Sequence, residues 1–451
     1  MVGGVLAGCQ SYEARPLDPE AHREAWRGRT LEGESLADFL ERLEARTGDV
    51  VDALDPSDGL SLREAQLVAL VYNPGLRLAR LRLGRAEASA AEAGRWNDPA
   101  LSLSVLNITD DVPDPWLVST GLSLSLPLSG RLGAERGLAE AEQLAAEASL
   151  LEEEWAVWRD VRSAWIEWSA ARLRVEETER FATEVAELLR GVTELEALGE
   201  VPRTEAALFR LELGARQNQL RGLRGEVDAL EHRLLMLLGL PPVTSIELLP
   251  SLAEDDADAA AEAEALERRN PGLARLRQEH EVAEARLRRE IRKQYPDLIL
   301  GPLFESEQGQ SRIGLSGAIP LPVLNANRRG IAEARAERKL ARETVESTLE
   351  LLVGRWEAAR VRAEALADQR EDMAQVLVPL VDRQLADATE LMRLGEADST
   401  LVLLESLVRS FETRIELIDT RSAEALARTE AVHLIGPQLA DAPPETTQET
   451  P

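Results

Sequence analysis

The sequence predicts an α+β protein built from a duplicated unit, in which each half contains a β-hairpin and a pair of long helices. Three observations lead to this fold class. Short sequence markers recur in the same order, Leu and Ser alternate between paired prolines, and apolar residues then repeat with helical spacing over long stretches. Composition agrees, because Ala, Leu, Glu and Arg dominate while aromatic residues make up only 4% of the 451-residue chain.

Four markers establish the duplication. They are Asn-Pro-Gly-Leu at 73–76 and 270–273, a proline at 99 and 296, Gly-Leu-Ser at 121–123 and 314–316, and Leu-Gly-Glu at 198–200 and 394–396. The first two pairs are 197 positions apart, and the last two are 193 and 196 apart. We infer a tandem duplication in which one hairpin loop has shortened.

The duplication sets the expected domain boundaries. We expect a signal or lipobox remnant at 1–9, an N-terminal extension at 10–59, a first repeat at 60–257, a second repeat at 258–436 and a tail at 437–451. The tail is rich in Pro, Thr, Glu and Gln, a composition typical of disordered segments.

Alternating residues predict one β-hairpin in each repeat. Leu101, Leu103 and Val105 are separated by serines, and leucines alternate with serines again from 122 onward. Strands are expected at about 99–107 and 116–128, and at about 296–304 and 311–321 with a turn at 305–311. The pattern suits membrane strands with apolar side chains outward and small ones inward, and it suits half-buried soluble hairpins equally well.

The stretches after each hairpin predict helices too long for a globular core. Apolar residues recur at spacings of three and four, and a helix of about 60 residues extends about 90 Å. Helices are expected at about 131–195, 203–239, 330–394 and 398–434, with a bend at Pro379. Because glycine commonly ends a helix in a left-handed conformation, we expect Gly199 and Gly395 to be the turns between paired helices.

Charge and cysteine content narrow the function classes. A net charge of −29 argues against nucleic acid as a partner, because phosphate binding requires a clustered excess of Lys and Arg. No run of 18 apolar residues occurs, so a membrane span would have to be formed by strands. The single cysteine, Cys9, follows Leu-Ala-Gly in a pattern that resembles a bacterial lipobox, although residues 1–8 contain no Lys or Arg.

An enzyme is not expected. The histidines at 22, 232, 280 and 433 lack the spacing of a metal site, and no Gly-rich phosphate loop or nucleophile elbow occurs. We therefore assign no catalytic, cofactor-binding or metal-binding residues.

The duplication, the order of strands and helices, the Asn-Pro-Gly helix starts, the Leu-Gly turns and the lipobox together resemble the outer membrane efflux protein family, typified by TolC. The heavy-metal efflux lipoproteins are the most similar branch, and the resemblance covers about residues 60–436. It implies a homotrimer that forms a 12-stranded β-barrel in outer membrane lipid, continued by an α-helical barrel across the periplasm.

The resemblance also implies partners and a role. The chain would be the outer-membrane channel of a tripartite efflux system, with a periplasmic adaptor and an inner-membrane pump, and Cys9 would carry the lipid. Leu198, Gly199, Leu394 and Gly395 would form the periplasmic tip, where family members meet the adaptor. The rival hypothesis is a lipid-anchored periplasmic coiled-coil scaffold without channel activity, which leaves the two hairpins unexplained.

Acidic residues near the tip are candidates for an entrance that favours cations. They are Glu200, Glu205, Glu396, Asp398 and Glu405. Solvated helix faces explain the same residues equally well. Some family members carry aspartates six and nine positions after the second tip glycine, but Leu401 and Leu404 occupy those positions here, so the aspartate gate is not transferred.

Overall fold

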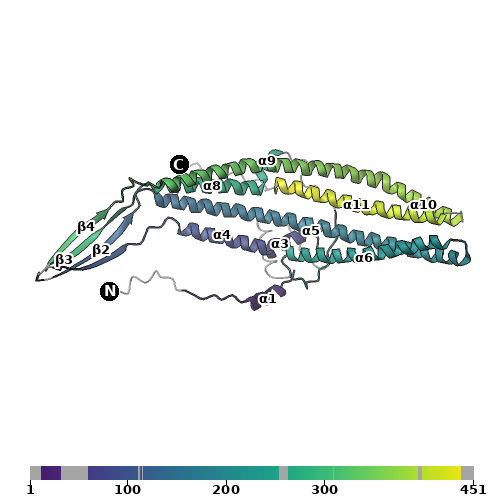
Figure 1. Cartoon of the computed structure of the whole chain (residues 1–451), viewed down its shortest axis with the longest axis horizontal. Coiled ribbons are helices and arrows are strands. Elements are labelled where there is room, and N and C mark those ends of the chain that lie inside the picture. The colour runs from purple at the N-terminus through teal and green to yellow at the C-terminus, as the bar shows by residue number, and fades with distance from the viewer. Residues whose placement is uncertain are drawn as a thin grey trace, which may run out of the picture.

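The computed structural model is elongated, with a sheet at one end and long paired helices along the rest of its length (Figure 1). It describes residues 12–31, 59–109, 112–113, 115–252, 263–307, 309–394 and 399–437. The candidate residues Cys9, Gly395, Glu396 and Asp398 lie outside these ranges, as does the tail from 438 onward. Within the described ranges, no helix combines the length and the apolar character that a membrane span requires.

The element order is the same in both repeats. The first repeat contains α3 (Leu62–Tyr72), α4 (Pro74–Glu92), β1 (Ala100–Asn107), β2 (Trp116–Leu126), α5 (Arg131–Leu198) and α6 (Arg203–Leu237). The second contains α7 (Ala263–Arg269), α8 (Pro271–Arg292), β3 (Leu298–Glu307), β4 (Gln310–Ala318), α9 (Arg328–Asp372), the π-helix η1 (Met373–Leu377), α10 (Val378–Leu394) and α11 (Ser399–Ile435). A short helix, α1 (Pro19–Arg27), precedes them. The duplicated α+β organisation is thus confirmed.

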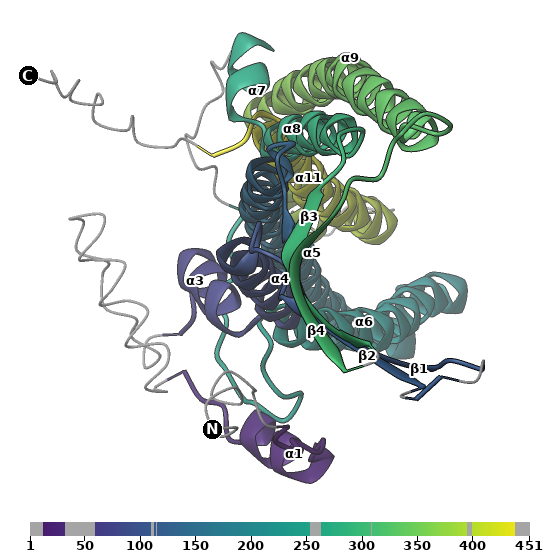
Figure 2. The same cartoon turned by 90° about the vertical axis from the view of Figure 1, so that its left-hand side faces the viewer.

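The four strands form one antiparallel sheet in the order β1-β2-β3-β4. The central pair, β2 and β3, joins the two repeats, with Leu126 opposite Leu298 and Leu117 opposite Glu307. Seen from its end, the sheet is an arc (Figure 2). The hairpins of the two repeats therefore build a single structure.

The second hairpin turns within the expected range of 305–311, but its turn is shorter than expected. Strand β3 continues to Glu307, and Glu305 lies opposite Arg312 of β4. Glu305 and Glu307 are polar residues on one face of a strand, and such residues are also common in loops. Prolines at 127 and 320 explain why β2 and β4 end earlier than expected, since proline cannot donate a ladder hydrogen bond.

The effect of Pro379 is local. The π-helix η1 ends two residues before Pro379, and α10 then continues to Leu394. A π-turn accommodates a residue that cannot donate its backbone hydrogen bond, so the helix passes the proline without stopping. At the place of the expected bend, the helix therefore has a wider π-turn.

Two equivalent joints lie midway along the molecule, where the helices near the sheet meet those that continue away from it. In the first joint, Asn73 caps α4 through Gly75 N at 2.8 Å and donates its Nδ2 to Leu237 O at the end of α6, also at 2.8 Å. In the second joint, Asn270 caps α8 and donates to Leu434 O at 2.7 Å. The Asn-Pro-Gly repeat is thus the point where each long hairpin is attached.

The main core surrounds the first joint. It is formed by α3, α4, α5 and α6, and Trp165 of α5 is fully buried there. A smaller core surrounds the second joint, where Leu273 and Trp356 pack together. Since α5 contacts α4, α6, α8 and α11, this 68-residue helix connects the two halves.

Candidate membrane sheet and tunnel tip

The register sorts the side chains of the sheet onto two faces of opposite character. One face, the apolar face, carries Leu101, Leu103, Val105, Val118, Leu122, Leu124, Leu126, Leu298, Leu300, Phe304, Ile313 and Leu315. The other, the polar face, carries Ser102, Ser104, Ser119, Gly121, Ser123, Ser125, Gly301, Glu305, Glu307, Arg312, Gly314 and Ser316. The separation is incomplete, because Leu106, Leu117, Ile299 and Leu303 lie on the polar face and Thr120, Ser306 and Ser311 lie on the apolar face.

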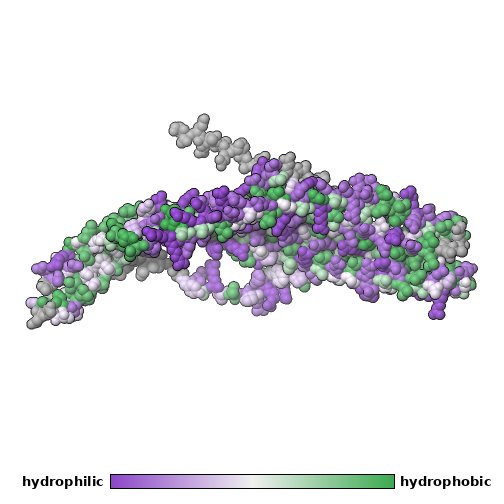
Figure 3. Space-filling view, turned by 45° about the horizontal axis from the view of Figure 1, so that its top comes forward, coloured by the Kyte–Doolittle hydropathy of each residue, from purple (hydrophilic) through white to green (hydrophobic). Residues whose placement is uncertain are grey.

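The apolar face is not the side of a soluble core. Leu101 is 79% exposed and Ile313 is 86% exposed, although both point to the same side as the other leucines of the sheet. Figure 3 shows apolar residues gathered over the strands. A half-buried soluble hairpin would bury this face, whereas a membrane strand presents it to lipid.

Aromatic residues flank the sheet at both ends. Trp96 and Tyr295 precede β1 and β3 at the helical end, and Trp116 begins β2 at the hairpin end. All three are more than half exposed. Exposed aromatic side chains at the two ends of a β-sheet are typical of the two interfaces of a membrane. The sequence contains this signal, but it is weak because each position holds a single residue.

A buried acidic residue joins the two helices that flank the second hairpin. Glu290 of α8 is 8% exposed and accepts hydrogen bonds from Lys293 Nζ at 2.7 Å and Asn327 Nδ2 at 2.8 Å. Burial alone would raise the pKa of this carboxyl, but the bonds from Lys293, Asn327 and Arg289 outweigh it and lower the pKa to about 2. Glu290 is therefore ionised at neutral pH and fixes the start of α9 to the end of α8.

At the opposite end, each long helical pair ends in an exposed tip. Helix α5 ends at Leu198, which is 73% exposed, and Gly199 adopts a left-handed conformation with φ of 78°. Helix α10 ends at Leu394, which is 64% exposed. The structure thus brings two equivalent leucines to the same end of the molecule, with their side chains open to a partner.

The acidic candidates differ in their surroundings. Glu200 and Glu405 are exposed, whereas Glu205 is partly buried and accepts a hydrogen bond from Thr400 Oγ1 at 2.8 Å. Leu401 and Leu404 occupy the positions at which some family members carry aspartates. Leu404 packs against a small apolar core that includes Phe209. Leu404 therefore stabilises the tip from within.

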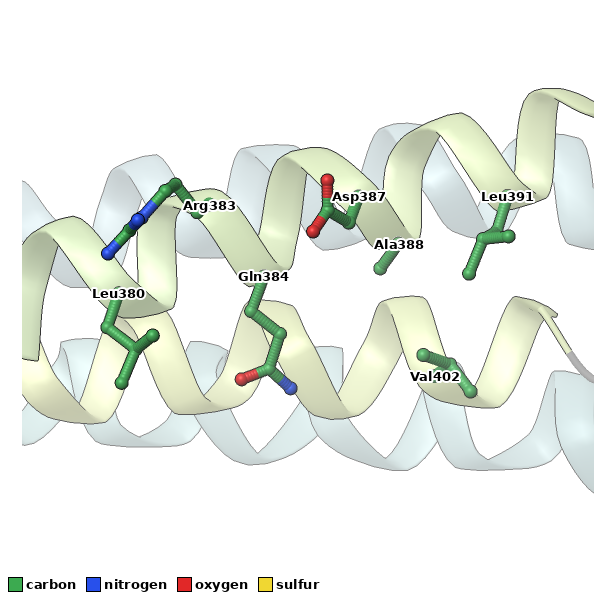
Figure 4. A pocket seen from close by; sticks show the side chains of 7 residues that line it. All are labelled: Leu380, Arg383, Gln384, Asp387, Ala388, Leu391 and Val402. Carbon is green, nitrogen blue, oxygen red and sulfur yellow. The ribbon is translucent and has the colours of Figure 1, made fainter.

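A groove lies between α10 and α11 close to the tip (Figure 4). Its volume is about 480 Å³, and it is lined by Leu380, Arg383, Gln384, Asp387, Ala388, Leu391 and Val402. Leu380 and Val402 are 51% and 43% exposed, so an apolar strip on this hairpin is open to solvent in the single chain.

Charged and aromatic contacts hold the two helical hairpins together. The guanidinium of Arg216 on α6 lies 5.4 Å from the ring centre of Phe181 and 4.7 Å from that of Phe411. Arg174 of α5 pairs with Asp419 of α11 at 2.7 Å. These contacts connect one repeat to the other between the joints and the tip.

Among the described residues, no group of His, Cys, Asp and Glu is arranged to hold a metal ion.

Several solved structures share the fold of this chain. VceC, an outer membrane protein from Vibrio cholerae, matches with a TM-score of 0.71 and 18% identity, covering 83% of this chain and 96% of that one. The CmeC outer membrane channel of Campylobacter jejuni matches with a TM-score of 0.71 and 17% identity, covering 84% and 86%. CusC matches with a TM-score of 0.70 and 19% identity, covering 83% and 92%. The chain has the fold of an outer-membrane channel.

Part of the sequence itself matches a known family. Residues 68–240, the greater part of the first repeat, match the family described as outer membrane efflux protein. The resemblance inferred from the duplicated markers is thereby confirmed, and this family and its structural relatives are channels rather than enzymes. No curated protein matches the sequence.

Proposed function

We propose that the chain is the outer-membrane channel of a tripartite efflux system and that it acts as a homotrimer. The observation that carries the proposal is the sheet, which has one apolar and one polar face and joins directly to the long helices. A membrane channel requires that combination, because lipid contacts one face while water and cargo contact the other.

The sheet edges support the trimer. Among the described strands, β1 and β4 each have a neighbour on one side only. In a four-stranded antiparallel sheet these two strands run in opposite directions, so β4 of one chain continues the antiparallel order beside β1 of the next. Three such sheets close into 12 strands without a free edge.

The exposed tip supports docking to an adaptor. Leu198 and Leu394 are exposed at the ends of α5 and α10, at the end of the molecule that lies farthest from the sheet. By resemblance to the family, an adaptor and its inner-membrane pump would dock at this end, and Gly199 and Gly395 would belong to the docking site. The exposed carboxylates of Glu200 and Glu405 would add negative charge to the entrance. Acylated Cys9 would anchor the chain to the inner leaflet of the outer membrane.

The test is single-channel recording in a planar bilayer with the purified full chain. We expect discrete current steps from a species that migrates as a trimer until it is heated. Replacing Glu200 and Glu405 together with glutamine reduces cation preference and leaves insertion unchanged. Folded protein that never inserts would instead support the lipid-anchored scaffold.

Docking needs a separate readout. The change Leu198→Glu with Leu394→Glu removes both apolar tips without touching the sheet, so we expect normal conductance and loss of efflux in cells. Unimpaired efflux by this variant would refute the tip as the adaptor site while leaving the channel intact.

A further inference from the structure

The two joints share their glycines and asparagines but differ in the residue that precedes the Asn-Pro-Gly motif. Gly239 and Gly436 follow the last turns of α6 and α11, both have positive φ, and each lies against the backbone of the residue before the Asn-Pro-Gly motif. That residue is Arg269 in the second repeat and Tyr72 in the first, at the same offset of 197. In the second joint, Arg269 Nη2 donates to Gly436 O at 3.0 Å, so the helix end is neutralised by its own repeat.

Tyr72 cannot donate in this way, and the first joint obtains a guanidinium from elsewhere. Arg29 Nη1 donates to Gly239 O at 2.7 Å from a position 210 residues earlier in the chain. Its guanidinium also lies 5.5 Å from the centre of the Tyr72 ring. The same carbonyl therefore receives the same chemical group in both joints, from different sources.

The contacts around Arg29 extend this attachment. Tyr72 Oη donates to Thr30 O at 3.5 Å, and Leu31 packs against the main core. Farther along, Leu60 is 1% exposed and its N–H donates to Glu247 O at 2.7 Å, in the segment after α6. The chain that precedes α3 is thus attached to the chain that follows α6 at two places, through Arg29 and through Leu60.

We propose that residues 12–31 form a strap that closes the first joint, with Arg29 supplying from outside the repeat the guanidinium that Arg269 supplies within the second. The end of α6 then needs the strap in addition to Asn73 and the main core, whereas the end of α11 is held by contacts within its own repeat. The two hairpins consequently differ in how they can be released: detaching the N-terminal segment loosens the first hairpin alone.

Hydrogen exchange followed by mass spectrometry on the purified full chain tests the strap. Arg29→Ala should speed exchange of the amides at the end of α6, including Leu240 N–H, which is bonded to Leu235 O, by about tenfold. The corresponding amides at the end of α11, such as Gly436 N–H, should not change. Arg27→Ala is the matched control, because Arg27 lies two residues away and is exposed.

A rescue variant separates the strap from a general loss of folding. In the Arg29→Ala chain, the further change Tyr72→Arg recreates the second-joint arrangement and should restore slow exchange at the end of α6. It should also restore folding if Arg29→Ala alone prevents it. The proposal is overturned if Arg29→Ala leaves exchange within twofold of the original chain, or if Tyr72→Arg restores neither protection nor folding.

Discussion

Thr400 donates a hydrogen bond to Glu205 over 2.8 Å, and this pair connects the two helical hairpins at the tip. Thr400 is 8% exposed at the start of α11, and Glu205 lies in the first turn of α6. Glu205, one of the acidic candidates near the tip, is therefore also a contact between the two repeats.

Removing this pair should loosen the tip. Thr400→Val keeps the size of the side chain but removes the donor, and Glu205→Gln weakens the acceptor. A double-mutant cycle on chemical unfolding should give a coupling of about 1 kcal/mol. Strictly additive effects of the two single changes would contradict a direct interaction.

Asn73 should be among the most sensitive positions of the first repeat. Asn73→Ala removes both the cap of α4 and the donor to Leu237 O, so we expect a loss of about 3 kcal/mol. Asn73→Ser keeps a capping oxygen and loses the donor to Leu237 O, so its cost should be about half. Asn218→Ala, at an exposed position of α6, should cost less than about 0.5 kcal/mol. Thermal unfolding followed by circular dichroism compares the three, and equal costs for Asn73→Ala and Asn73→Ser would show that the cap contributes nothing.

Glu290 should make stability depend on pH in the acidic range. Its pKa is lowered in the folded state from an ordinary value of 4.5 to about 2, so its contribution is complete above pH 4.5 and is lost as pH falls toward 2. Glu290→Gln removes this contribution. The difference in melting temperature between the original chain and the variant should therefore shrink between pH 5 and pH 2. A constant difference across that range would refute the assignment.

The two faces of the sheet should respond oppositely to charge. Leu103→Arg places a charge on the apolar face, which costs about 2 to 4 kcal/mol near the middle of a bilayer. Ser104→Arg places the same charge one residue later on the polar face, where water fills a channel. We expect Leu103→Arg to reduce insertion into lipid vesicles and Ser104→Arg to insert normally with altered conductance. Equal insertion of both variants would count against the assignment of the faces.

The sequence predicts the local elements of this fold well. The Leu and Ser alternation after Pro99 gives β1 and β2, and Leu198 and Gly199 end α5 at the turn that their residue types require. These features depend on neighbouring residues, so spacing and turn chemistry determine them. Glu305 shows the limit of such prediction. A polar residue on the polar face of a strand cannot be distinguished by residue type from a residue in a loop.

The contacts between distant segments could not be predicted. The sequence identifies Asn73 as a helix start. Its second hydrogen bond is to the backbone carbonyl of Leu237, and this partner cannot be predicted because every residue has a backbone carbonyl. The same holds for Arg29 and Gly239. The pairing of β2 with β3 depends on two hairpins meeting in space, and no pattern within either hairpin specifies it.

That central strand pair also dictates the order in which the molecule can fold. Leu126 and Leu298 are adjacent in the sheet although they are 172 positions apart in the sequence. The whole first helical hairpin lies between them in the chain. Contacts so distant in sequence form late, because the intervening chain must first become compact. The helical hairpins, whose contacts are local, can form before the sheet. A chain still in transit to the outer membrane would then carry finished helices and unpaired strands, and its apolar strand residues would need protection until they reach lipid.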